Sequence, residues 1–400
     1  MVKSLFNEKA NLDVKEVRIM WKRYGITLVF CLFVTVSLVI FYSTSGKVAQ
    51  ENEHLQLKTL SGEVDETKDL KLIGNSWVNR MPKKVEVSLD GSDYSKLPVK
   101  NLVTYETVTM SYYVKLDELQ HEYKSFMRGK WAIDSLYEDE TQLIYVHTLY
   151  NESEERENTE ELLVDFYNKK SKDTTQFTVS LPSELKDHND YIGILDVQMM
   201  KDQLIIILDS QDEGKQSVYY LAIKGGKISD SHILLEASPK ENVNIRSAGN
   251  LINDSWIKTS KYMLLEKDTW DAEKQSSTYE MYAVELASAQ VKKVNVPGNS
   301  DYGEQRFYNG QTVYYLEKNY FKKLDLDTLN SSILSDDLNI SDIEGMKEKD
   351  QRLYVLALSK NRSHLLIIYD LNDNKEIYRG EVNPKEYKKI SSIELYYVQF

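Results

Sequence analysis

Cysteine is almost absent from this sequence. The 400 residues include one cysteine, Cys31, so no disulfide can join two parts of the chain. Secreted eukaryotic domains commonly depend on disulfides, whereas a domain without them depends on its own hydrophobic core. The composition therefore excludes a disulfide scaffold and is typical of a protein at a bacterial surface.

Positive charge is also scarce. Lysine and arginine number 50 against 63 aspartates and glutamates, which gives a net charge of −13. Residues 1–24 carry +3 of this total, so the rest of the chain carries −16. Such an acidic surface repels phosphate backbones, and nucleic acid is therefore excluded as a partner.

The common catalytic signatures are missing as well. The chain has no G-x-S-x-G, no H-E-x-x-H, no Walker loop and no G-x-G-x-x-G. Adjacent acids such as Asp336–Asp337 and Glu160–Glu161 are interpreted as exposed loop charges. His121–Glu122 is interpreted as the solvated face of a helix predicted over 115–129. The sequence therefore assigns no catalytic residue and no cofactor, and a protein without catalysis is the first expectation.

One long apolar run is present. Residues 25–42 contain no charge over eighteen positions, which is about the minimum that crosses a hydrocarbon core of roughly 30 Å. The preceding segment 1–24 is basic, so the positive-inside rule predicts a cytoplasmic tail, a single transmembrane helix and an extracellular remainder in the cell membrane. A cleaved signal peptide is the alternative. Residues 43–70 are polar and are interpreted as a linker, followed by one domain over 71–400.

Short runs of β-branched and aromatic residues fill the rest of the chain, which predicts an all-β domain. One kind of strand recurs five times. Each copy precedes a second strand, a polar turn and a third strand, and the copies lie 40 to 63 residues apart. The recurring strands are 142–150, 203–211, 261–269, 312–320 and 352–360.

A repeat of this size with three or four short strands resembles the β-propeller superfamily at the level of fold. The resemblance covers about residues 130–382 and implies six or seven blades. The final strand, Ile393–Phe400, is expected to pair near the N-terminal strands and close the ring. Two β-sandwich domains are the alternative architecture.

The last repeat contains a calcium-loop pattern. Asp370, Asn372, Asn374 and Glu381 occupy places one, three, five and twelve of such a loop, but Lys375 stands where the sharp turn needs glycine. The flanking segments are predicted strands, so a β-hairpin is the favoured interpretation. Asp370, Asn372 and Asn374 remain weak candidates for calcium.

These features together predict a membrane-anchored binding, scaffold or sensor/regulatory protein. Its expected partners are the membrane, through 25–42, and another envelope or membrane protein. Polar insertions at 151–161 and 267–280 are the expected contact sites, since such loops carry binding functions on a rigid scaffold. The alternative function is an envelope hydrolase that acts on glycan or peptide through carboxylates.

Overall fold

The structure is a computed structural model of the whole chain. It describes residues 27, 29–40, 55–78, 81–96, 111–150, 159–186, 191–238, 243–248, 250–251, 257–296, 306–318, 320–336, 338–384 and 393–400. The chain forms two compact units. The first is Met1–Glu53 with Val78–Met81, and the second is His54–Trp77 with Pro82–Phe400.

In the first unit, residues 27 and 29–40 are helical. Within the described ranges, no helix has the length and apolarity needed to span a membrane. The predicted transmembrane helix over 25–42, and the cell-membrane localisation inferred from it, are therefore not supported. The predicted tail 1–24 lies outside the described residues.

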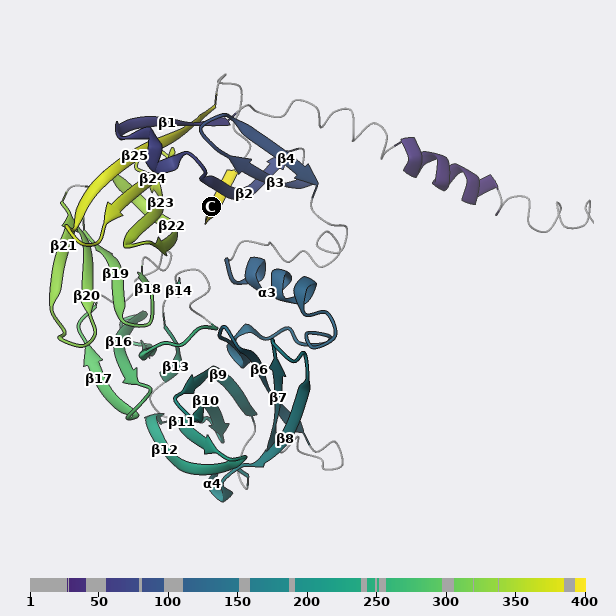
Figure 1. The fold of residues 1–400 in the computed structure, drawn as a ribbon, viewed down its shortest axis with the longest axis vertical. Coiled ribbons are helices and arrows are strands. Elements are labelled where there is room, and N and C mark those ends of the chain that lie inside the picture. Colours follow the sequence, from purple (N-terminus) through teal and green to yellow (C-terminus); the bar gives the residue numbers. More distant parts are fainter. Residues whose placement is uncertain are drawn as a thin grey trace, which may run out of the picture. The chain divides into compact units, whose positions relative to one another are not determined.

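The second unit is built from β-strands (Figure 1). The first thirteen are β1 (Leu55–Gly62), β2 (Lys71–Val78), β3 (Met81–Val87), β4 (Ser92–Lys96), β5 (Leu136–Glu138), β6 (Gln142–Tyr150), β7 (Thr159–Asn168), β8 (Thr174–Ser180), β9 (Tyr191–Met200), β10 (Gln203–Asp212), β11 (Lys215–Lys224), β12 (Lys227–Ala237) and β13 (Val243–Ser247). The others are β14 (Asn250–Leu251), β15 (Tyr262–Asp271), β16 (Ser276–Glu285), β17 (Gln290–Val294), β18 (Arg306–Tyr308), β19 (Thr312–Glu317), β20 (Tyr320–Asp325), β21 (Ser331–Ser335), β22 (Ile340–Lys349), β23 (Arg352–Ser359), β24 (His364–Asp370), β25 (Lys375–Pro384) and β26 (Ile393–Gln399).

The strands form six sheets, which confirms the all-β prediction at this level. We name them sheet I (β26-β2-β3-β4), sheet II (β5-β6-β7-β8), sheet III (β9 to β12), sheet IV (β13-β15-β16-β17), sheet V (β14-β18-β19-β20-β21) and sheet VI (β22-β23-β24-β25-β1). The strand pairs are antiparallel, except that β14 runs parallel to β18. The five recurring sequences are all strands of these sheets, namely the second strands of sheets II, III, IV and VI and the third strand of sheet V.

From sheet II through sheet VI to sheet I, each sheet shares a hydrophobic core with the next one. Separate clusters of buried side chains join sheet II to III, III to IV, IV to V, V to VI, and VI to I. The sequence of strand β10 is an unbroken apolar run because both faces of the strand are buried. Leu204, Ile206 and Leu208 face the core shared with sheet II, whereas Ile205 and Ile207 face the core shared with sheet IV. A strand covered on both faces has no polar side to alternate with.

Tight turns connect neighbouring strands within the sheets. Glu213–Gly214, Gly225–Gly226 and Asp350–Gln351 form two-residue hairpin loops in which both residues have positive φ. This geometry matches the right-handed twist of the strands.

The two ends of this unit complete sheets begun elsewhere in the sequence. Strand β26 pairs with β2 in sheet I, as predicted for the final strand. Strand β1 pairs with β25 in sheet VI, although its residues Leu55–Gly62 fall in the segment interpreted as a linker. Segments more than 300 residues apart therefore hydrogen-bond as edge partners.

Helical segments are few. Among the described residues of the second unit they are η1 (Val64–Thr67), α3 (Ser111–Glu122), η2 (Ile133–Ser135) and α4 (Ser183–Lys186). Helix α3 begins and ends earlier than the helix predicted over 115–129. Its Leu116 and Leu119 pack on sheet II with Phe126 and Leu136. Figure 1 shows α3 beside sheet II in the same unit.

Candidate functional site

The calcium-loop pattern lies in the hairpin between β24 and β25. These strands pair from His364–Val382 to Asp370–Lys375, which confirms the hairpin interpretation. Asp370 Oδ1 accepts hydrogen bonds from the backbone N–H groups of Asn372 (2.8 Å) and Asp373 (3.3 Å). Asn374 has a φ of 53°, and its side-chain oxygen accepts from the Lys323 ammonium. The Asp370 oxygen thus accepts hydrogen bonds within the turn, and the Asn374 oxygen accepts one from a lysine. Calcium binding stays a prediction.

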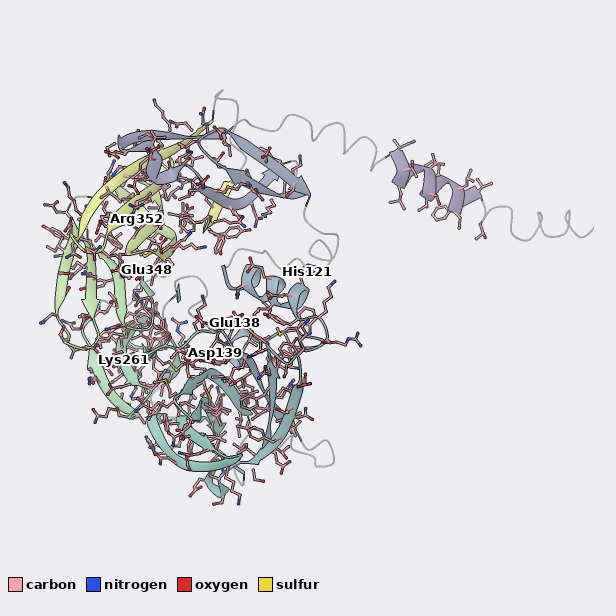
Figure 2. All side chains as sticks on the ribbon, in the orientation of Figure 1. His121, Glu138, Asp139, Lys261, Glu348 and Arg352 are labelled. Carbon is pink, nitrogen blue, oxygen red and sulfur yellow. The ribbon has the colours of Figure 1, made fainter. Side chains whose placement is uncertain are left out.

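The acids singled out from the sequence do not meet at one place. Asp336 is exposed and Asp337 lies outside the described residues. Glu160 and Glu161 lie in β7 rather than in a loop, and the Ser180 hydroxyl donates to Glu161 (3.2 Å). His121 is exposed on α3 (Figure 2). Among the described residues, no three His, Cys, Asp or Glu side chains are grouped as a metal site would require.

A different carboxylate, Asp196, lies on the edge strand β9 of sheet III. Strand β9 pairs with β10 through a β-bulge, because Ile207 faces Asp196 while Leu208 faces Ile194. The extra residue, Leu195, has no partner in the register. A bulge re-aims the side chains that follow it and often lies beside an active site. Asp196 thereby stands apart from the apolar face of β9.

A hydrogen-bond chain holds Asp196 in place. Gln198 Nε2 donates to Asp196 Oδ1 (3.0 Å), and the backbone N–H of Ser260 donates to Gln198 Oε1 (3.0 Å). Gln198 is only 1% exposed. Because both ends of its amide are bonded, Gln198 keeps one orientation toward Asp196 Oδ1.

Two further polar groups from other sheets complete this candidate site. Asp134 belongs to η2, directly before sheet II, and Tyr308 belongs to β18 in sheet V. Tyr308 is buried in one cluster with Leu264 of sheet IV. The negative charges of Asp196 and Asp134 both act on Tyr308, and the charge of Asp134 acts on Asp196. Residues of sheets II to V thus converge here. Figure 2 labels Glu138, the last residue of β5, and Asp139, which follows it.

The surroundings of this site favour protonated carboxyls. Burial raises the pKa of Asp134 to about 6. Burial also raises the pKa of Asp196 to about 7. The Gln198 and Val197 hydrogen bonds oppose that increase, and the charge of Asp134 adds to it. Both side chains keep some contact with solvent. Burial, followed by the charge of Asp196, raises the pKa of Tyr308 far above its ordinary value.

Two carboxyls whose pKa values are raised toward neutrality, one of them also by the charge of the other, are suited to acid–base chemistry. Between about pH 6 and pH 7, one of the pair is protonated while the other carries the charge. A proton donor and a proton acceptor are then present together, as hydrolysis of a glycosidic or peptide bond requires. We call Asp134 and Asp196 the carboxyl pair.

Sequence reasoning missed both members of this pair. Asp134 lies in "WAIDSLY" and Asp196 in "YIGILDVQMM", and each is a lone acid inside an apolar run. A charged residue is rarely buried without a partner or a functional role, so this context is the signal that would have selected them.

Comparisons with known proteins add the following findings. No protein-family model matches the chain. No curated protein sequence matches it either. Similar solved structures include a puromycin hydrolase (9% identity, 85% of this chain and 55% of that one, TM-score 0.35). A puromycin-hydrolysing peptidase of Mycobacterium tuberculosis is 6% identical, with 82% and 56% coverage and a TM-score of 0.33. TolB of Acinetobacter baumannii is 9% identical, with 80% of both chains covered and a TM-score of 0.22.

The chain spans about half the length of the two puromycin-hydrolysing proteins. At these identities and TM-scores, none of their substrates or residues is transferred to this chain. The prediction of a membrane-anchored binding, scaffold or sensor/regulatory protein is nevertheless corrected here. Among the described residues no helix is long and apolar enough to span a membrane, which removes the membrane anchor on which that prediction rested.

Proposed function

We propose that the second unit is a six-bladed β-propeller. Three observations support this architecture. Sheets II to VI repeat one strand plan, each sheet shares a core with the next, and β1 and β26 complete sheets VI and I at opposite ends of the sequence. Addition of terminal strands to existing sheets is the usual way in which a propeller closes its ring. The strands β5, β9, β13, β22 and β26 would then lie innermost, with β14 and β18 beside them.

We further propose that this protein is a hydrolase of glycan or peptide bonds and that the carboxyl pair is its acid and base. The observation that carries the proposal is the convergence of Asp134 of η2, Asp196 of β9 and Tyr308 of β18. Ligands commonly bind where inner elements of a repeat scaffold meet, since polar groups from several elements converge there. In this assignment Asp196 is the proton donor, because its pKa is the higher of the two, and Asp134 is the base.

The test is turnover by the full-length protein against two substrate panels. One panel consists of nitrophenyl glycosides and the other of internally quenched peptides. Active preparations are then compared with Asp134→Asn and Asp196→Asn. Each change should lower kcat by at least about 100-fold, the usual contribution of a general acid or base.

Asp209→Asn is the matched control. Asp209 is also a buried aspartate in sheet III whose Oδ1 accepts from a glutamine, Gln216 (2.8 Å), but it belongs to β10. Its replacement should leave kcat within about twofold, since it is not a member of the pair. Equal losses in all three variants would refute the assignment of the carboxyl pair.

The partner predictions stay open as proposals. Residues 151–158 of the first insertion lie outside the described residues. The second insertion, 267–280, is a hairpin extension, since β15 and β16 remain paired out to Asp271 and Ser276. A rigid hairpin with an exposed Trp270 is a better contact surface than a loose loop.

A further inference from the structure

A second polar cluster, which contains neither member of the carboxyl pair, lies between sheets IV and V. Its centre is Glu266 on β15, which is 1% exposed. Glu266 Oε1 accepts from Arg246 Nε (3.1 Å) and Nη2 (2.7 Å), and Glu266 Oε2 accepts from Arg306 Nη2. One carboxylate therefore accepts hydrogen bonds from two guanidinium groups.

Arg306 is the unusual member of this cluster. Its residue is 4% exposed, and its Nε and Nη1 atoms are buried without a hydrogen-bond partner in the described part of the chain. Nε carries one hydrogen and Nη1 carries two, so three of the five guanidinium donors are unused. Arginine stays charged at every physiological pH, so the side chain cannot remove this cost by losing a proton.

Among the described residues, no neighbouring acid accepts a hydrogen bond from Arg306 Nε or Nη1. Asp268 follows Glu266 on the same face of β15, but its Oδ1 is itself buried without a hydrogen-bond partner among the described residues. Arg246 is partly exposed, with 47% of its side chain accessible, whereas the Arg306 side chain is 5% accessible. Water can therefore solvate Arg246, but it cannot solvate Arg306 in the same way.

Buried donors and buried charges are normally paired, and an unpaired group points to an ion or ligand. We propose that Arg306 holds a small monovalent anion between β15 and β18, with the Nε and Nη1 hydrogens as its donors. The occupant is of halide or small-carboxylate size, because the donor atoms are shielded from solvent. This site is independent of the hydrolase proposal, and neither depends on the other.

The test measures thermal unfolding of the full-length protein while sodium chloride replaces sodium gluconate at constant ionic strength. Gluconate is too bulky for the site, and the general salt effect is the same for every variant. Chloride should raise the wild-type Tm by about 3 °C when it reaches about 100 times its dissociation constant. The Arg306→Met variant should lose this response. Arg246→Met, the matched control, should keep it.

Glu266→Gln tests the proposed anion site in a protein that keeps Arg306. With the carboxylate neutralised, Arg306 has no counter-charge, so the chloride response should appear at about tenfold lower concentration. A parallel series with sodium formate distinguishes the occupants: a response to formate assigns a small carboxylate, and a response to chloride alone assigns a halide. The proposal is overturned if wild type shows no anion response, if Arg306→Met responds as wild type does, or if Glu266→Gln leaves the response unchanged.

Discussion

At the scale of single residues, this protein places carboxyl groups where water solvates them poorly. Burial raises the pKa values of Asp196 and Asp134 toward neutrality, whereas the hydrogen bond from Lys84 lowers the pKa of Glu86. The difference lies in the neighbours, because a nearby ammonium stabilises the carboxylate and a desolvating environment penalises it. The carboxyl pair therefore reduces stability in its ionised form, and this cost is measurable.

Replacement of Asp196 with asparagine should change how stability depends on pH. The folded-state pKa of Asp196, about 7, lies above its unfolded value, so the native state binds the extra proton between about pH 4 and pH 7. Stability must then fall as pH rises through that window, by up to about 4 kcal/mol. Asp196→Asn removes this loss. Urea unfolding should show a larger gain over wild type at pH 8 than at pH 5. A pH-independent difference would contradict the raised pKa.

Gln198 should set the proton affinity of Asp196. Its amide donates to the ionised form of the carboxyl and so lowers the pKa of Asp196. Gln198→Leu should raise this pKa by roughly one unit. Carbon NMR of labelled aspartate carboxyls would measure the change, and the alkaline limb of any pH–rate profile should move upward with it.

Gln216→Leu is the control for that experiment. Gln216 donates to Asp209 and bonds both backbone groups of Ile245, so its loss also removes a buried network. It should lower stability without moving the titration of Asp196. If Gln216→Leu shifts the pKa of Asp196 as much as Gln198→Leu does, the change in pKa results from general loosening of the fold and not from loss of the Gln198 hydrogen bond.

At the scale of elements, the close approach of β22 and β26 depends on glycine. A Cβ atom at Gly345 would lie 2.6 Å from the backbone oxygen of Tyr396. Gly345 also follows a shift in the register between β22 and β23, so the strand bends at this point. Backbone cannot move aside as a side chain can, and sheets I and VI meet here.

Gly345→Ala should therefore destabilise the protein by about 2 kcal/mol, within the range for overpacked sites. Gly193→Ala is the matched control on β9. Its Cβ would meet only the Tyr191 side chain, which is exposed and can rotate away. Chemical denaturation of both variants checks the prediction. Equal midpoints would show that β22 and β26 are not held as closely as the structure places them.

At the scale of the whole molecule, stability depends on strands that join the two ends of the sequence. Leu395 and Val398 of β26 are buried in the core shared by sheets I and VI, together with Leu55 and Leu57 of β1. Burial of such a side chain stabilises the fold by about 1.5–3 kcal/mol. Removal of β26 would expose this core and leave β2 as an unpaired edge.

A chain that stops after Ser392 should consequently unfold at much lower denaturant concentration or aggregate. A chain that lacks only Phe400, a residue beyond the end of β26, should remain close to wild type. Circular dichroism during denaturation separates the two outcomes. Cooperative wild-type unfolding of the shorter chain would argue against closure of the fold by β26.

Local pattern determined much of this architecture. The five recurring strands, the hairpin at Asp370–Lys375 and the pairing of the final strand follow from apolar runs and turn residues, because strands and tight turns are specified by near neighbours in sequence. Hydropathy alone also predicted a membrane helix over 25–42, which the described helix does not support.

Only the tertiary structure decided where the chemistry lies. Asp134, Asp196 and Tyr308 are far apart in the sequence, and nothing local marks them beyond an acid in an apolar run. Their proton affinities are set by desolvation and by charges that other sheets bring near. The same holds for Arg306, whose unused donors exist only because sheets IV and V exclude water there. A pKa and a buried charge are properties of the packed interior, whereas a strand is a property of its own residues.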